Sequence, residues 1–220
     1  KRIHSLTQDE GVIEGHEQLK SYITNYYKGL FGPPEESTFS LNEDLTADIP
    51  QVSVEENGLL TAPYTEEEVQ KAVFKMECNK APGPDGFPAE FYQTFWDTIK
   101  SDLLDLFSDL HSRQLELFRL NFGEVILLPK VNEAERIQQY RPICLLNVSF
   151  KIFTKVATIR LNTVADHVVQ PSQTAFMQGR NILDGVAVLH ETVHEMHTKK
   201  LNGVILKLDF EKAYDKVKWS

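Results

Sequence analysis

One acidic side chain near the end of the sequence has the setting of a metal ligand. Asp209 directly follows the apolar run 204–208, which we expect to form a β-strand. A carboxylate at the end of a strand is a hard oxygen ligand for Mg²⁺, and Mg²⁺ needs few protein ligands when phosphate groups complete its shell. Taken alone, Asp209 is more simply an acid facing solvent. Asp215, six residues on, is explained as a helix residue paired with Lys212.

Two basic side chains flank a ten-residue loop and could bind phosphate. Lys130 ends the apolar segment 124–130, which we expect to be a buried strand, and Arg141 stands just before Pro142. A hairpin that carries one Lys and one Arg can hold a triphosphate, because Arg forms bidentate contacts and Lys acts as a point charge. The spacing alone is equally compatible with two solvated basic residues.

The segment HETVH, residues 190–194, matches the zinc-protease pattern H-E-x-x-H on an expected helix. His190 and His194 are four residues apart and share a helix face, as zinc ligands must. However, His197 lies too close to serve as the distant third ligand, and no suitable acid follows. A zinc protease is therefore the weaker alternative.

Charge is unevenly distributed along the chain. The net charge is −9, but residues 1–120 hold 10 basic and 22 acidic side chains, whereas residues 121–220 hold 13 basic and 10 acidic ones. A mildly basic second half is compatible with a polyanionic partner. No apolar stretch is long enough to cross a membrane. The sequence starts at Lys1, and we expect both ends to continue in a longer protein.

The periodicity of apolar residues predicts mainly helices with a few strands, which is the α+β class. A polar, acidic linker is expected over 33–60, and the loop 82–86 is stiffened by two prolines and two glycines. Thr65 and Glu68 have capping-box spacing at the start of one helix. In the last expected helix, the residues predicted to face inward are Ile182, Val186, Leu189, Val193 and Met196. The expected helices cover 17–31, 65–76, 89–112, 150–165 and 182–199.

Four segments occur in an order and spacing that resemble a known polymerase family. They are KAPGPDGFPAEFY, LLPKVNEAERIQQYRPICLLNVSFKIFTKVATIRL, QTAFMQGRNILD and LKLDFEKAYDKV. Together they resemble the reverse transcriptases of LINE-type (non-LTR) retrotransposons, which are abundant in flowering plants. The resemblance is strong over 65–220. The front of the chain resembles the connector that follows the endonuclease domain in such polyproteins.

The resemblance implies a right-hand polymerase fold, with a connector over 1–60 and with the fingers and the beginning of the palm over 61–220. It also implies roles for several residues. Asp209 matches the first catalytic aspartate, and the backbone carbonyl of Phe210 matches the adjoining metal ligand. Tyr214 matches the aromatic gate that excludes a ribose 2′-hydroxyl. Lys130 and Arg141 match the residues that hold the triphosphate.

Three further residues match elements that lie beside the template in this family. They are Lys80, which precedes the proline- and glycine-rich loop, and Gln173 and Arg180, which belong to the QTAFMQGRNILD segment. Contact of Arg180 with a backbone phosphate is expected. The implied partners are an RNA template, a DNA primer and deoxynucleoside triphosphates, with no membrane.

The mechanism implied by the resemblance is two-metal phosphoryl transfer, in which two Mg²⁺ ions stabilise the attacking and leaving oxygens. The family's second pair of aspartates lies in an aromatic-x-D-D motif, but no Asp-Asp dipeptide occurs in these 220 residues. One aspartate cannot hold two ions, so we expect this chain alone to be inactive. The alternative is a decayed or domesticated remnant that binds RNA without catalysis.

Overall fold

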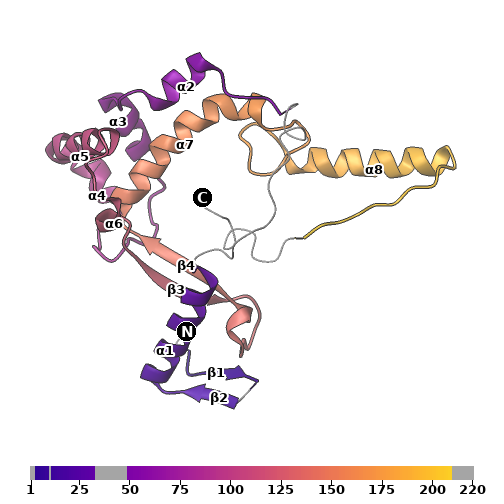
Figure 1. Ribbon diagram of the computed structural model, residues 1–220, viewed down its shortest axis with the longest axis horizontal. Coiled ribbons are helices and arrows are strands. Elements are labelled where there is room, and N and C mark those ends of the chain that lie inside the picture. The colour runs from indigo at the N-terminus through magenta and orange to yellow at the C-terminus, as the bar shows by residue number, and fades with distance from the viewer. Residues whose placement is uncertain (1–2, 10, 33–48, 210–220) are drawn as a thin grey trace. The chain divides into compact units, whose positions relative to one another are not determined.

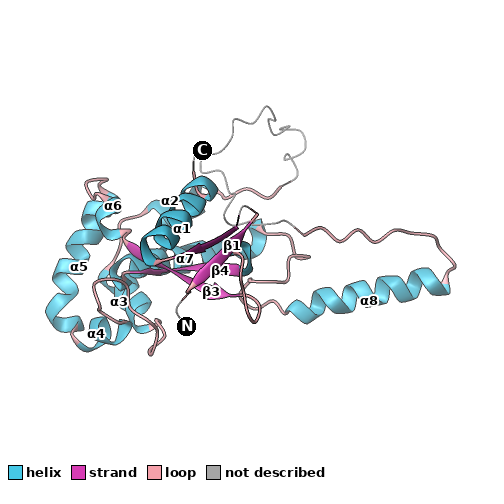
Figure 2. Cartoon of the chain, turned by 90° about the horizontal axis from the view of Figure 1, so that it is seen from below, coloured by secondary structure: helices cyan, strands magenta, loops and turns pink. Residues whose placement is uncertain are grey.

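The computed structural model describes residues 3–9, 11–32 and 49–209 (Figure 1). Helices dominate, and the strands of the described part form two two-stranded sheets, so the predicted α+β class is confirmed (Figure 2). The chain divides into two compact units. The first unit comprises Lys1–Leu45, Ile126–Ile143 and Gly203–Ser220, and the second comprises Thr46–Val125 and Cys144–Asn202.

The first unit begins with a β-hairpin and a helix. Strand β1 (Ser5–Gln8) pairs antiparallel with β2 (Gly11–Glu14), and Leu6 lies opposite Ile13. Helix α1 (His16–Leu30) follows and confirms the helix expected over 17–31. The sequence reasoning expected one helix before residue 60 and did not anticipate this hairpin.

The same unit contains the tip of a second hairpin. Strands β3 (Gly123–Pro129) and β4 (Tyr140–Leu146) pair with each other, and a short 3₁₀ helix, η2 (Ile137–Gln139), precedes β4. The backbone N–H of Thr7 donates to the carbonyl of Glu135 at 2.8 Å. The buried core of this unit therefore joins the two hairpins and α1, and it consists of Leu6, Leu19, Tyr27, Ile137 and Tyr140.

The second unit is a helical bundle, in which α2 and α3 run beside α7 (Figure 1). Its helices are α2 (Val54–Thr61), α3 (Glu66–Phe74), α4 (Ala89–Thr94), α5 (Trp96–His111), α6 (Leu117–Leu120), α7 (Val148–Val168) and α8 (Ile182–Thr198). The capping box predicted at Thr65 and Glu68 opens α3. The core is formed by Val69, Ala72, Val73, Ala89, Tyr92, Trp96, Leu103, Phe107, Val148, Ile152, Phe153 and Val156.

The helix predicted over 89–112 is interrupted at Phe95, which separates α4 from α5 and has φ −100° and ψ 20°. The break turns Trp96 into the core and leaves Phe95 half exposed. A regular stripe of every fourth residue would have required Phe95 to be buried, so packing of the larger Trp side chain overrides the local pattern. Helix α2 also lies within the segment predicted to be linker, of which residues 33–48 fall outside the described part.

Three predictions about strands and burial are wrong. Strand β3 forms where expected, but most of its side chains are exposed. Helix α8 also forms, but no described residue of it is buried, and Ile182, Val186, Leu189 and Val193 are all exposed. Residues 204–209 form no strand. A strand needs a hydrogen-bonded neighbour, and none of the described strands pairs with this segment.

Within the described residues, no helix is both long enough and apolar enough to span a membrane.

Candidate functional site

Lys130 and Arg141 lie on the two sides of the β3–β4 hairpin, as the sequence predicted. The backbone N–H of Lys130 donates to the carbonyl of Gln139 at 2.7 Å. Gln139 is therefore the residue opposite Lys130, and Arg141 lies two residues further along the chain. The Lys130 ammonium donates to the carbonyl of Gln138 at 2.9 Å, so two of its N–H bonds remain for a ligand. Both side chains are exposed. The hairpin thus presents two cations on one hydrogen-bonded element.

The tip of this hairpin is held by the N-terminal segment. Ile137 is buried in the same core cluster as Leu6 and Tyr27, and the Tyr140 hydroxyl donates to the carbonyl of Ala134 at 2.8 Å. Arg136 forms an ion pair with Asp9 at 3.4 Å. The segment that the sequence indicated to be a connector therefore supports the element that carries Lys130 and Arg141.

Asp209 is exposed, and among the described residues it makes no hydrogen bond or ion pair. No group of three or more His, Cys, Asp or Glu side chains in the described part is placed to hold a metal ion. A single carboxylate supplies too few ligands for two Mg²⁺ ions. The metal-binding role of Asp209 therefore stays a prediction, and the predicted roles of Phe210 and Tyr214 lie outside the described residues.

The same observation bears on the zinc-protease alternative. His190 and His194 are exposed on α8, and no third ligand from the described part of the chain lies beside them. Within the described part of the chain, the H-E-x-x-H match therefore lacks a complete set of zinc ligands.

The proline- and glycine-rich loop packs tightly against the start of α7. A Cβ atom at Gly83 would lie 2.4 Å from the backbone nitrogen of Asn147, so only glycine fits there. The N–H of Asp85 donates to Asn147 Oδ1 at 3.3 Å, and the N–H of Phe87 donates to Asp85 Oδ1 at 3.0 Å. Gly86 has φ +77°, which favours glycine at that position. These contacts fix the loop that follows Lys80.

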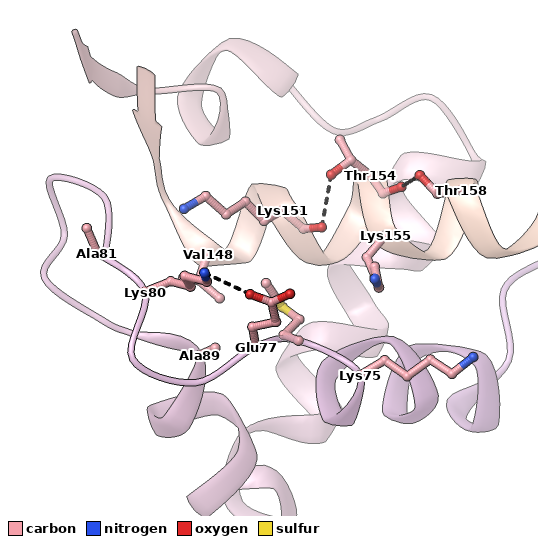
Figure 3. Close-up of a pocket in the computed structure, with 11 residues that line it drawn as sticks. Lys75, Glu77, Lys80, Ala81, Ala89, Val148, Lys151, Thr154, Lys155 and Thr158 are labelled. Atoms are coloured by element: carbon pink, nitrogen blue, oxygen red, sulfur yellow. Dashed lines mark hydrogen bonds and ion pairs between the residues drawn. The ribbon is translucent and has the colours of Figure 1, made fainter. Parts of the chain in front are cut away.

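Lys80 lines a pocket of about 410 Å³ between this loop and α7 (Figure 3). Three more lysines line it, namely Lys75, Lys151 and Lys155, and its one acidic lining residue is Glu77. The sequence reasoning picked out Lys80 and missed the other three. The available signal was the four-residue spacing of Lys151 and Lys155 on one helix face, but the fold was needed to bring Lys75 beside them.

Arg180 is engaged by the backbone. Its Nη1 donates to the carbonyls of Gln170 (2.6 Å) and Gln173 (3.0 Å), and its Nη2 donates to those of Asp166 (2.9 Å) and Val169 (3.0 Å). The guanidinium thereby satisfies carbonyls at the end of α7 and holds the loop that follows. A phosphate contact of Arg180 stays a prediction, and only Nε–H remains to make it.

The loop held by Arg180 presents two further side chains. Gln173 is exposed, and its Nε2 donates to the carbonyl of Ala175 at 3.1 Å. Phe176 is 96% exposed and has φ +63°, a backbone conformation that bulky residues rarely adopt. The structure thus brings Gln173 and Arg180 together, as it does Lys130 and Arg141.

Comparison with known proteins adds to this geometry. The family model described as "Reverse transcriptase (RNA-dependent DNA polymerase)" matches residues 128–220. The "Transposon TX1 uncharacterized 149 kDa protein" of Xenopus laevis is 32% identical over 218 residues, which are 99% of this chain and 17% of that protein. The "Putative 115 kDa protein in type-1 retrotransposable element R1DM" of Drosophila melanogaster is 27% identical over 157 residues, 70% of this chain and 15% of that protein.

The chain thus spans less than a fifth of the length of either relative. The family match begins two residues before Lys130 and includes Arg141, Gln173, Arg180 and Asp209. Both relatives are proteins of transposable elements, and their similarity extends beyond the matched domain toward the start of the chain. The chain therefore carries part of a reverse transcriptase domain over residues 128–220, and over most of its length it is similar to proteins of non-LTR retrotransposons.

Proposed function

We propose that this chain supplies the nucleotide- and template-binding part of an RNA-directed DNA polymerase. The observation that carries the proposal is the reverse transcriptase family match, which includes Lys130, Arg141 and Asp209. In this proposal residues 1–60 are the connector, and residues 61–220 are the fingers and the beginning of the palm. The partners are an RNA template, a DNA primer and deoxynucleoside triphosphates.

The β3–β4 hairpin binds the triphosphate of the incoming nucleotide. Arg141 is exposed, and the Lys130 ammonium has two uncommitted N–H bonds beside the paired backbone of the hairpin. A guanidinium and an ammonium on the same hairpin suit an extended polyphosphate. Because these contacts touch no base, they serve all four nucleotides equally.

Asp209 and the backbone carbonyl of Phe210 contribute to Mg²⁺ binding once further carboxylates join them, since the described residues are too few to hold two ions. When bound, the metal ions would supply charge stabilisation for nucleotidyl transfer. Tyr214 discriminates against ribonucleotides. On the template side, Lys80 and Gln173 contact RNA, and Arg180 supports the Gln173 loop and adds a contact through Nε–H.

Nucleotide incorporation kinetics test the role of the hairpin. The longest product that the gene encodes is assayed on a primed RNA template, as the wild type and as Lys130→Ala and Arg141→Ala. We expect KM for each of the four deoxynucleotides to rise by about tenfold or more, by a similar factor for all four. Lys28→Ala, an exposed change on α1, is the matched control and leaves KM unchanged. Unchanged KM in both hairpin variants would contradict the assignment.

A second function is favoured by one observation. Asp209 stands alone among the described residues, whereas lysines gather in a pocket, so an RNA-binding remnant without catalysis is the alternative. Asp209→Asn separates the two functions. It abolishes polymerisation by a complete enzyme and leaves simple RNA binding unchanged.

A further inference from the structure

We propose that the lysine-lined pocket between α7 and the segment 75–81 binds the phosphodiester backbone of single-stranded RNA through Lys75, Lys151 and Lys155 together with Lys80 (Figure 3). The inference rests on the proposed function for the identity of the polyanion. It adds three binding residues to a site of which the sequence indicated one.

The charge of the pocket is the first argument. Four lysines and one glutamate line it, so it is strongly positive in a chain whose net charge is −9. Lys151 and Lys155 on α7 are half-buried, whereas Lys75 and Lys80 are exposed. Cations gathered around one pocket repel one another, and a bound polyanion relieves that repulsion.

The arrangement of the lysines is the second argument. Lys151, Lys155 and Lys75 point in different directions along the pocket instead of converging on one spot (Figure 3). Lys151 and Lys155 are separated by about 6 Å along the axis of α7. A row of separate point charges suits successive phosphates of a strand better than it suits one compact anion.

The lining also indicates what the pocket does not read. It includes no aromatic side chain on which a base could stack, and no Arg, Asn or Gln that could read a base edge. The hydroxyls of Thr154 and Thr158 donate to backbone carbonyls of α7 at 2.9 Å and 2.7 Å. The site therefore positions a strand without reading its sequence.

Glu77 acts as the resident counter-ion. Its Oε2 lies 2.9 Å from Lys80 Nζ, and both side chains are largely exposed. The hydrogen bond and charge of Lys80, with a smaller effect of Lys155, lower the pKa of Glu77. An exposed ion pair of this kind contributes little free energy, so a phosphate group can take the place of the carboxylate at low cost.

The test measures binding of a fluorescently labelled, unstructured 20-nucleotide RNA to the full chain by anisotropy over a range of KCl concentrations. The site variant is Lys75→Gln, Lys151→Gln and Lys155→Gln combined. The control variant removes the same charge from exposed lysines elsewhere, as Lys20→Gln, Lys28→Gln and Lys71→Gln. Glu77→Gln is measured separately, and circular dichroism shows whether each variant is folded.

We expect the site variant to lose about tenfold or more in affinity at about 0.1 M salt, and its log Kd–log[salt] slope to fall by about 2, since each phosphate contact contributes about 0.7. Glu77→Gln should bind several-fold more tightly, and it tests the site even if the triple variant does not fold.

A site variant that binds like the control, or a Glu77→Gln variant with unchanged affinity, would overturn the pocket assignment while RNA remains the partner. Failure of the unmodified chain to bind RNA at any salt concentration would overturn the proposed RNA partner as well.

Discussion

Arg160 on α7 and Glu68 in the first turn of α3 are joined at two points. Arg160 Nε donates to Glu68 Oε1 at 2.7 Å, and Nη2 donates to Oε2 at 2.8 Å. The same guanidinium donates to the carbonyls of Leu60 (3.1 Å), Ala62 (2.6 Å) and Pro63 (2.9 Å) and lies 4.2 Å from the centre of the Tyr64 ring. One side chain of α7 thus fixes the connection between α2 and α3.

Replacement of Arg160 should therefore destabilise the second unit. Arg160→Ala leaves the Glu68 carboxylate and three carbonyls without this partner in a partly buried setting, and we expect the free energy of unfolding to fall by about 2–4 kcal/mol. Arg160→Lys keeps the charge but loses the planar fork, and it should recover only part of the loss. Urea unfolding checks both values. Equal stability of Arg160→Ala and the wild type would contradict the structure.

Glu68 predicts a pH dependence of stability. The hydrogen bond from Arg160, opposed by burial and helped by Thr65, lowers the pKa of Glu68 from 4.5 to about 2. Because the folded-state pKa is the lower one, the stabilisation is fully present above about pH 4.5 and is lost as the pH falls toward 2. We expect about 1–2 kcal/mol, allowing for the partial exposure of Glu68 to solvent.

The check is urea unfolding of the wild type and of Glu68→Gln at a series of pH values. The stability difference between them should shrink steadily between about pH 5 and pH 2. A constant difference over that range would mean that Glu68 titrates in the folded state as it does in the unfolded chain.

Two glycines give a matched pair of substitutions with opposite expected signs. Gly83→Ala would place a methyl group 2.4 Å from Asn147 N and 2.6 Å from its Cα, so the loop must move away from α7, at a cost of about 1–3 kcal/mol. Gly58→Ala meets nothing within 4 Å inside α2 and should stabilise by about 0.5–1 kcal/mol. Thermal melts compare them. A Gly83→Ala variant as stable as Gly58→Ala would show that the loop does not pack on Asn147 in solution.

The hairpin that carries Lys130 and Arg141 should loosen when its support is removed. Leu6 is 1% exposed in the core shared with Ile137, so Leu6→Ala should cost about 2–4 kcal/mol and speed amide exchange over 126–143. Val12→Ala, on the paired strand but 60% exposed, is the control and should change stability by about 0.5 kcal/mol or less. Hydrogen exchange read by mass spectrometry separates the two. Equal exchange in both variants would remove the supporting role of the N-terminal segment.

The sequence predicted well those elements that depend only on residues close to one another in the chain. The capping box at Thr65 and Glu68 requires only two side chains three residues apart, and it forms as expected. The loop with Gly83 and the hairpin with Lys130 were also placed correctly. The ion pair of Glu68 with Arg160 could not be predicted from the sequence, because Arg160 lies 92 residues later in the chain. Only the packing of α7 brings the two side chains together.

Burial was the less predictable property. The apolar stripe of α8 indicates which side of the helix is apolar, but a pattern cannot say whether another element covers that side, and Ile182 and Val186 are exposed. The same limit applies to 204–208, whose composition favours a strand that none of the described strands pairs with. The lysine pocket was missed for a related reason, since Lys75 and Lys151 become neighbours only in the fold.

We propose that the polymerase of which this chain is a part depends on Asp209 for its chemistry. The most direct measurement is primer extension on an RNA template by the longest product of the gene, with Asp209→Asn beside Asp102→Asn, an exposed acid on α5, as control. We predict DNA synthesis by the wild type and the control, and a loss of about three orders of magnitude or more in Asp209→Asn. DNA synthesis that persists at the wild-type rate in Asp209→Asn would contradict the catalytic role proposed for Asp209.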